Sequence, residues 1–127
     1  MKKSRDQRDR IFRKLRTILR KYEPPFVAKS DYGSRYELWS VKNVIIAGRK
    51  RKEVFFASLI IQSSYVGFYY MPIYAAKNLK KFFKKELLST LNGKSCFHIK
   101  ELNSVLVTQI AASLRQALKL YRLRGWV

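Results

Sequence analysis

The chain has few acidic residues, one cysteine, one histidine and no long uninterrupted apolar run. It carries 8 Asp and Glu against 28 Lys and Arg in 127 residues. A single cysteine excludes an internal disulfide, and one Cys with one His is too few for a zinc site of about four ligands. The apolar window from Val54 to Tyr74 is interrupted by Gln62, Gly67 and Pro72. It therefore predicts paired strands and no membrane span.

The abundant features are positive charge and material for a core. The net charge is +20, while 47% of the residues are hydrophobic and 14% are aromatic. This composition predicts one folded domain over residues 1–127, rather than a basic tail. The polar residues after Met1-Lys2-Lys3 argue against a secretory signal, so we expect a cytoplasmic location. A dense positive field attracts polyanions and speeds their encounter, but it specifies neither fold nor chemistry.

Apolar periodicity predicts the order of the elements. Residues 1–23 form a basic N-terminal segment, in which a stripe with helical spacing predicts an amphipathic helix over about 6–22, closed by Pro24-Pro25. Runs of β-branched and aromatic residues then predict strands, with Gln62-Ser63-Ser64 as a hairpin turn. The predicted strands cover residues 27–29, 35–40, 44–47, 53–62, 65–71 and 94–99, and 48–52 is interpreted as a charged connection.

The C-terminal third changes to a helical period. One or two short helices are predicted from Asn78 to Asn92-Gly93, where the glycine would serve as C-cap. A last helix is expected to begin at Asn103 or Ser104 and to end before Gly125, with the final residues folding back. The result is a single α+β domain with a mostly antiparallel sheet of about five strands, an N-terminal helix, a middle helical segment and a C-terminal helix.

The predicted central hairpin is apolar on both faces. We expect helices to cover one face, and another element, a ligand or a second copy of the chain to cover the other, so a homodimer is one hypothesis. Strict alternation groups Phe55, Ala57, Leu59 and Ile61 on one face, and Phe56, Ser58 and Ile60 on the other.

The basic side chains fall into several clusters: the first helix, the connection after the third strand, the lysine-rich segment before Leu87, and the last helix. A charged run is commonly only a solvated surface, yet these clusters exceed what solubility needs. They predict a low-specificity surface for nucleic acid or another polyanion. Its candidate residues are Arg13, Arg16, Arg20, Arg49, Lys50, Arg51, Lys52, Lys80, Lys81, Lys84, Lys85, Arg115 and Lys119.

Cys96 and His98 stand two residues apart on a predicted strand, so their side chains share a face. A nucleophilic pair would need hydrogen-bond reach and a third orienting group. The favoured interpretation is instead a buried cysteine and a structural histidine. Aromatic side chains on the sheet can stack nucleobases, although they are also ordinary strand formers. A small pocket is one further hypothesis, with Trp39, Phe56, Phe68, Tyr70, Cys96 and His98 as its lining.

Several blocks of the sequence together carry a resemblance to a known family. The blocks are Tyr36-Glu37-Leu38-Trp39-Ser40, Gly48-Arg49-Lys50-Arg51, 55–58, 65–72, Gly93-Lys94-Ser95-Cys96-Phe97-His98-Ile99 and 121–126. They resemble the YdhG-like domain, a bacterial domain of unknown function, over about residues 22–127. The most specific block is 93–99, which follows a predicted Leu-rich helix. The resemblance implies a small cytoplasmic α+β domain, distantly similar to frataxin, with no agreed catalytic residues.

The resemblance also implies an iron-chaperone role, because some members of the family are regarded as frataxin-like. Iron binding of that type needs converging carboxylates, whereas the acids here are scattered and a charge of +20 repels Fe²⁺. The first hypothesis is therefore a non-enzymatic binding module with a polyanion partner, with no cofactor, no metal site and no catalytic residue. The alternatives are an iron chaperone, and a small-ligand-binding domain or enzyme that uses Cys96 and His98.

Overall fold

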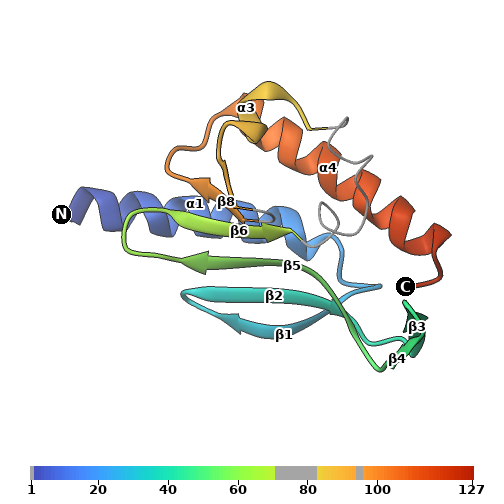
Figure 1. Ribbon diagram of the computed structural model, residues 1–127. Coiled ribbons are helices and arrows are strands. Elements are labelled where there is room, and N and C mark those ends of the chain that lie inside the picture. The colour runs from blue at the N-terminus through green and yellow to red at the C-terminus, as the bar shows by residue number, and fades with distance from the viewer. Residues whose placement is uncertain (1, 71–82, 94–95) are drawn as a thin grey trace.

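The computed structural model describes residues 2–70, 83–93 and 96–127. Its main element is an antiparallel sheet with the strand order β1-β2-β5-β6-β8-β7 (Figure 1). A separate hairpin pairs β3 with β4. The predicted α+β class is confirmed, with one strand more in the main sheet than the five expected. The strands are β1 (Val27–Tyr32), β2 (Arg35–Ser40), β3 (Val44–Ile46), β4 (Arg49–Arg51), β5 (Val54–Ile61), β6 (Val66–Tyr70), β7 (Leu91–Asn92) and β8 (Cys96–Ile99).

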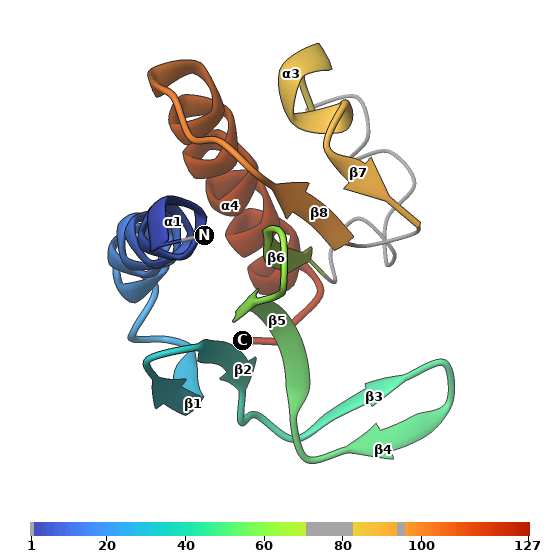
Figure 2. The same cartoon turned by 90° about the vertical axis from the view of Figure 1, so that its left-hand side faces the viewer.

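Two long helices, α1 (Lys2–Arg20) and α4 (Ser104–Leu123), cover one side of the sheet, which we name the inner face (Figure 2). The apolar stripe of α1 is buried there, because burying it removes a continuous apolar surface from water. The hydroxyl of Tyr70 donates to the Ser113 carbonyl at 2.6 Å. The Tyr121 hydroxyl donates to the Phe55 carbonyl at 2.5 Å. These two bonds fix α4 on the sheet.

A β-bulge in β5 changes the predicted orientation of two neighbouring phenylalanines. Leu38 pairs with Ala57 and Trp39 pairs with Phe55, so Phe56 is the additional residue on β5. Phe56 is fully buried in the core. Phe55 lies on the opposite side, which we name the outer face, in edge contact with Trp39 at 5.2 Å. Strict alternation grouped Phe55 with Ala57 and Leu59, whereas in the structure Phe56 shares their face. The predicted grouping was wrong for the two phenylalanines, because one extra residue shifts the period.

The outer face carries partly exposed side chains. On β6 and β8 they include Tyr69, Cys96 and His98. The ring of Tyr69 lies against Gly67, where a Cβ atom would sit 2.9 Å from the Tyr69 Cε2 atom. Glycine at this position therefore lets the tyrosine ring lie flat along its own strand.

The basic stretch after residue 48 forms a strand, not the expected connection. Strand β4 pairs with β3 through a turn at Ala47 and Gly48, whose φ angles are 53° and 78°. Positive φ at both central residues is typical of a type I′ hairpin turn. The β3–β4 hairpin reaches out beyond the main sheet (Figure 2). The β-branched run at 44–46 was visible in the sequence, but the charged partner strand lacks β-branched residues.

Within residues 83–93, the middle helical segment is shorter than predicted. Helix α3 (Lys85–Leu88) ends before Leu91, which joins β7. Gly93, with a φ of 82°, follows β7, so its predicted role as a helix C-cap is wrong. The predicted helical residues 78–82 and the strand residues Met71, Lys94 and Ser95 lie outside the described residues.

The last helix follows the prediction closely. The Asn103 side chain accepts a hydrogen bond from the Leu106 amide at 2.9 Å, which caps the N-terminus of α4. Gly125 has a φ of 73° and ends the helix. Trp126 then folds back onto the core. Its carbonyl accepts a hydrogen bond from the Ser40 hydroxyl, and only 8% of the residue is exposed.

Candidate polyanion-binding surface

Two adjoining hollows of about 620 and 330 Å³ lie between α1 and α4. They share Lys14 and Val107, so they form one continuous groove, which we name the α1–α4 groove. Apolar residues of both helices form its floor. Ile11, Ile18 and Ala111 contribute to this floor.

The sides of the α1–α4 groove are cationic. Arg10 and Lys14 come from α1, and Lys21 directly follows its last residue. Separations of four and seven residues place the three on one side of the helix axis. Arg115 comes from α4 on the opposite side. Among the residues that the structure describes, no acidic side chain lines either hollow, and all four cations are exposed. No carboxylate in the groove neutralises these four positive charges. An anion bound there would therefore be attracted by all four.

The cationic surface continues along α4. Lys119 and Arg122 follow Arg115 at i+4 and i+7, so the three side chains form a row on one helix face, and all three are exposed. Tyr22 lies in the groove near the start of this row. Burial raises the pKa of its hydroxyl, and the nearby Arg115 charge opposes that rise.

Two arginines predicted for this surface have partners inside the protein. Arg20 Nη2 lies 2.9 Å from an Asp31 carboxylate oxygen, and Arg16 Nη1 lies 3.8 Å from the other. The Arg20 guanidinium also lies over the Tyr36 ring at 5.3 Å. Arg16 and Arg20 therefore face the β1 edge of the sheet and turn away from the α1–α4 groove. Arg13 is exposed and lies outside the groove lining.

The other predicted cations lie in separate places. Arg49, Lys50 and Arg51 are exposed along β4, with Lys52 just after it. Lys84 and Lys85 are exposed at the start of α3. Figure 1 places α3 and the β3–β4 hairpin far apart on the molecule. Lys80 and Lys81 lie outside the described residues. Of the predicted polyanion residues that the structure describes, Arg115 alone lines the groove, and Lys119 extends its cationic side.

The six residues predicted for a small pocket lie on two sides of the sheet. Phe56, Phe68 and Tyr70 are fully buried on the inner face. The other three, Trp39, Cys96 and His98, are partly exposed on the outer face. The sheet itself separates the two groups, so the six do not line one cavity among the described residues.

Cys96 and His98 share the outer face, as their spacing predicted. The His98 ring stacks on Tyr65 with centroids 3.8 Å apart and an interplanar angle of 11°. Partial burial raises the pKa of the Cys96 thiol, while a hydrogen bond with Tyr69 acts in the opposite direction. A raised pKa leaves little thiolate at neutral pH, which disfavours a nucleophilic role.

We expect Cys96 in the folded protein to react with an aromatic disulfide reagent about tenfold more slowly at neutral pH than in the unfolded chain. Because burial raises its pKa, the rate should increase with pH and reach half its maximum above the ordinary value of 9.0. Absorbance of the released thiolate measures the rate, and the same protein in denaturant is the control. Faster reaction in the folded protein would show an activated thiolate.

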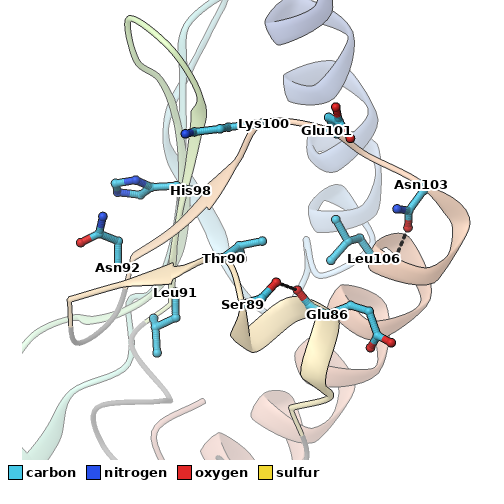
Figure 3. A pocket seen from close by; sticks show the side chains of 10 residues that line it. All are labelled: Glu86, Ser89, Thr90, Leu91, Asn92, His98, Lys100, Glu101, Asn103 and Leu106. Atoms are coloured by element: carbon cyan, nitrogen blue, oxygen red, sulfur yellow. Dashed lines mark hydrogen bonds between the residues drawn. The ribbon is translucent and has the colours of Figure 1, made fainter.

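Sequence reasoning did not identify a hollow of about 570 Å³ between α3, β7, β8 and the start of α4. Its polar residues point in different directions (Figure 3): His98 and Lys100 lie on one side, whereas Glu86 and Glu101 point away from them. The Gln109 amide donates to Glu86 at 2.7 Å, and this bond lowers the pKa of that carboxyl. These side chains do not converge on a common point, so they do not form an acid–base site.

The acidic residues near the β1–β2 end of the sheet are paired with cations or hydrogen-bond donors. Glu37 accepts from Arg35 and from the Trp39 indole, and Glu53 accepts from Lys29. Within residues 2–70, 83–93 and 96–127, no three His, Cys, Asp or Glu side chains gather where they could hold a metal ion. In the same residues, no helix combines the length and apolarity needed to cross a membrane.

Comparison of the chain with protein-family models, with curated proteins and with solved structures finds no match. Its function must therefore be inferred from its own residues and their arrangement.

Proposed function

We propose that this chain is a non-enzymatic binding domain for polyanions, with nucleic acid as the partner and the α1–α4 groove as the contact surface. One observation carries the proposal: Arg10, Lys14, Lys21 and Arg115 converge on a groove that no acidic side chain lines. The proposal retains the resemblance to YdhG-like domains as the family and the cytoplasm as the location. Homodimerisation through the outer face stays a prediction.

The shape of the cationic surface suits an extended partner. Lys14 and Lys21 are seven residues apart, which is about 10 Å along a helix axis, and Arg115 and Arg122 have the same separation. Charges distributed over this length can contact successive phosphates of a strand, whereas a single small anion would reach only one or two of them. The apolar floor can pack against sugars and bases between the phosphates.

Charge reversal in the groove tests the proposal. The double variant Lys14→Glu/Arg115→Glu should bind a labelled oligonucleotide at least about tenfold more weakly at low salt, because phosphate contacts are replaced by repulsion. Fluorescence anisotropy measures the affinity. Lys42→Glu/Lys100→Glu is the matched control, since it changes the net charge equally at exposed positions outside the groove.

The control should weaken binding by no more than about threefold, through the change in overall field alone. Equal losses in both double variants would contradict the groove as the contact surface. No binding by the unmodified protein at low salt would contradict polyanion binding itself. Circular dichroism melting curves establish that both variants remain folded.

The iron-chaperone alternative is not favoured by the described carboxylates. Glu23 accepts a hydrogen bond from the Tyr36 hydroxyl, and Asp31 pairs with Arg16 and Arg20. A carboxylate engaged by a guanidinium would have to lose that partner before it could bind a cation. The proposed function therefore assigns no cofactor and no metal.

A further inference from the structure

A hollow of about 270 Å³ lies where the β3–β4 hairpin meets the main sheet and the C-terminal residues. Trp39 and Phe55 contribute from the outer face of the sheet, and Trp126 contributes from the end of the chain. Arg51 and Arg124 also line the hollow, and both residues are exposed. Figure 1 shows the C-terminus beside the β3–β4 hairpin. We name this hollow the tryptophan pocket.

The aromatic walls of the tryptophan pocket are held in place before any ligand arrives. The Trp39 indole N–H donates to Glu37 at 3.1 Å, and its ring meets Phe55 edge-on at 5.2 Å. The Trp126 amide donates to the Tyr121 carbonyl at 2.8 Å, and the two rings pack edge-on at 5.0 Å. A ligand would therefore enter a preformed aromatic site with little ordering of its walls.

The charge of the tryptophan pocket is positive. Within the described part of the chain, no acidic side chain lines it. Glu53, next to the pocket in sequence, accepts from Lys29, and the Lys29 ammonium lies 4.7 Å from the centre of the Trp39 ring. The Arg124 guanidinium lies 5.1 Å from the centre of the Trp126 ring. Aromatic surfaces beside guanidinium groups match a ligand that combines a flat ring with a negative charge.

We propose that the tryptophan pocket binds one nucleotide of a single-stranded nucleic acid, with the base against Trp39 and Phe55 and a phosphate at Arg51 and Arg124. The pocket volume lies near the roughly 300 Å³ lower limit of small-molecule sites, which suits one planar base. A base paired within a duplex cannot enter it, whereas an unstacked base can.

The cationic row on α4 supports a strand as the source of this nucleotide. Arg115, Lys119 and Arg122 lead along the helix from the α1–α4 groove toward Arg124 at the pocket. The inference rests on the proposed function in this respect, because the groove holds the backbone while the pocket takes a base. Compared with the proposed function, this inference adds a preference for single strands over duplexes, which charge alone does not provide.

The test uses the chain's own fluorescence. The chain has 2 tryptophans, and both line the pocket, so intrinsic tryptophan emission reports on this site alone. A single-stranded oligonucleotide should quench the emission in a saturable way, because a base stacks on the indole. A duplex of equal charge should bind by anisotropy with little quenching. A nucleoside monophosphate at high concentration should quench weakly at the same site.

Four variants distinguish the pocket from the groove. Trp39→Ala removes a stacking surface, and Arg51→Gln removes one phosphate contact. Each should weaken single-strand binding about tenfold and leave duplex binding unchanged. Trp39→Phe keeps an aromatic wall and should retain most of the single-strand affinity. This variant also keeps the test decisive if Trp39→Ala folds poorly. Lys14→Glu/Arg115→Glu should retain quenching by the nucleoside monophosphate.

Binding of single strands without quenching, or equal losses for duplex and single strand in Arg51→Gln, would overturn the inference and leave the proposed function intact. Absence of binding to any polynucleotide would overturn the proposed function. If no polynucleotide binds, the nucleoside monophosphate still tests the pocket. Saturable quenching that is lost in Arg51→Gln would support the pocket as a nucleotide site, whereas no quenching would overturn the inference as well.

Discussion

Raising the salt concentration from about 50 to about 200 mM is expected to weaken duplex binding on the order of a thousandfold and single-strand binding roughly 300-fold. Each phosphate that a cation neutralises releases condensed counterions, and salt opposes that release. The logarithm of the affinity falls by about 0.9 per contact for a duplex and about 0.7 for a single strand, per logarithmic unit of salt. The six cations considered are Arg10, Lys14, Lys21, Arg115, Lys119 and Arg122.

Anisotropy titrations at several salt concentrations give this slope directly. Removing one contact, as in Lys14→Gln, should reduce the slope by about one for a duplex, whereas Lys42→Gln should leave it unchanged. Melting curves at each salt concentration show that the protein stays folded. A slope that corresponds to fewer than about two phosphate contacts would contradict the α1–α4 groove as an extended phosphate-binding surface.

Replacing Phe56 by alanine should lower the free energy of unfolding by about 3–5 kcal/mol. Phe56 is fully buried and stacks on Phe26, with ring centroids 3.9 Å apart and an angle of 12° between the planes. It also meets Tyr121 edge-on at 5.2 Å. Truncation therefore removes the favourable free energy of burying the ring. It also leaves a cavity between β5 and α4 that the backbone cannot move in to fill.

The neighbouring residue provides a matched control for this prediction. Phe55→Ala removes the same side chain from the partly exposed outer face, so its cost should be about 1 kcal/mol. Urea-induced unfolding, followed by circular dichroism, measures both variants. If Phe55→Ala proved the more destabilising of the two, β5 would follow unbroken alternation and the bulge described here would be incorrect.

Elements with a strong local signal were predictable from the sequence. The apolar stripes of α1 and α4, the Asn103 cap and the Gly125 terminator follow from short-range chemistry, and the structure has all of them. The bulge at Phe56 was not predictable, because β2 and β5 are separated by the β3–β4 hairpin and either register buries an aromatic ring. The end of α3 was missed because Leu91 continues the helical period but is held by β8.

The candidate groove was only partly predictable. The sequence shows that α1 is basic on most of its surface, but not which cations would face another helix. The sequence predicts Arg16 and Arg20 as polyanion-binding residues, but both contact Asp31 of β1. This contact depends on the tertiary fold, so the sequence alone does not show it. Likewise, nothing local brings Trp126 beside Trp39, because 86 residues separate the Ser40 hydroxyl from the Trp126 carbonyl that it binds.

Four of the 8 acidic residues lie together, which makes the charge of the molecule uneven. Glu23, Asp31, Glu37 and Glu53 all lie at or beside the β1–β2 end of the sheet, where they offset the local cations. The α1–α4 groove has no such compensation. In the field of a negatively charged chain, this asymmetry exerts a torque on the tumbling domain. The domain would therefore be turned with its groove forward before the first contact forms, so that a larger fraction of collisions becomes productive.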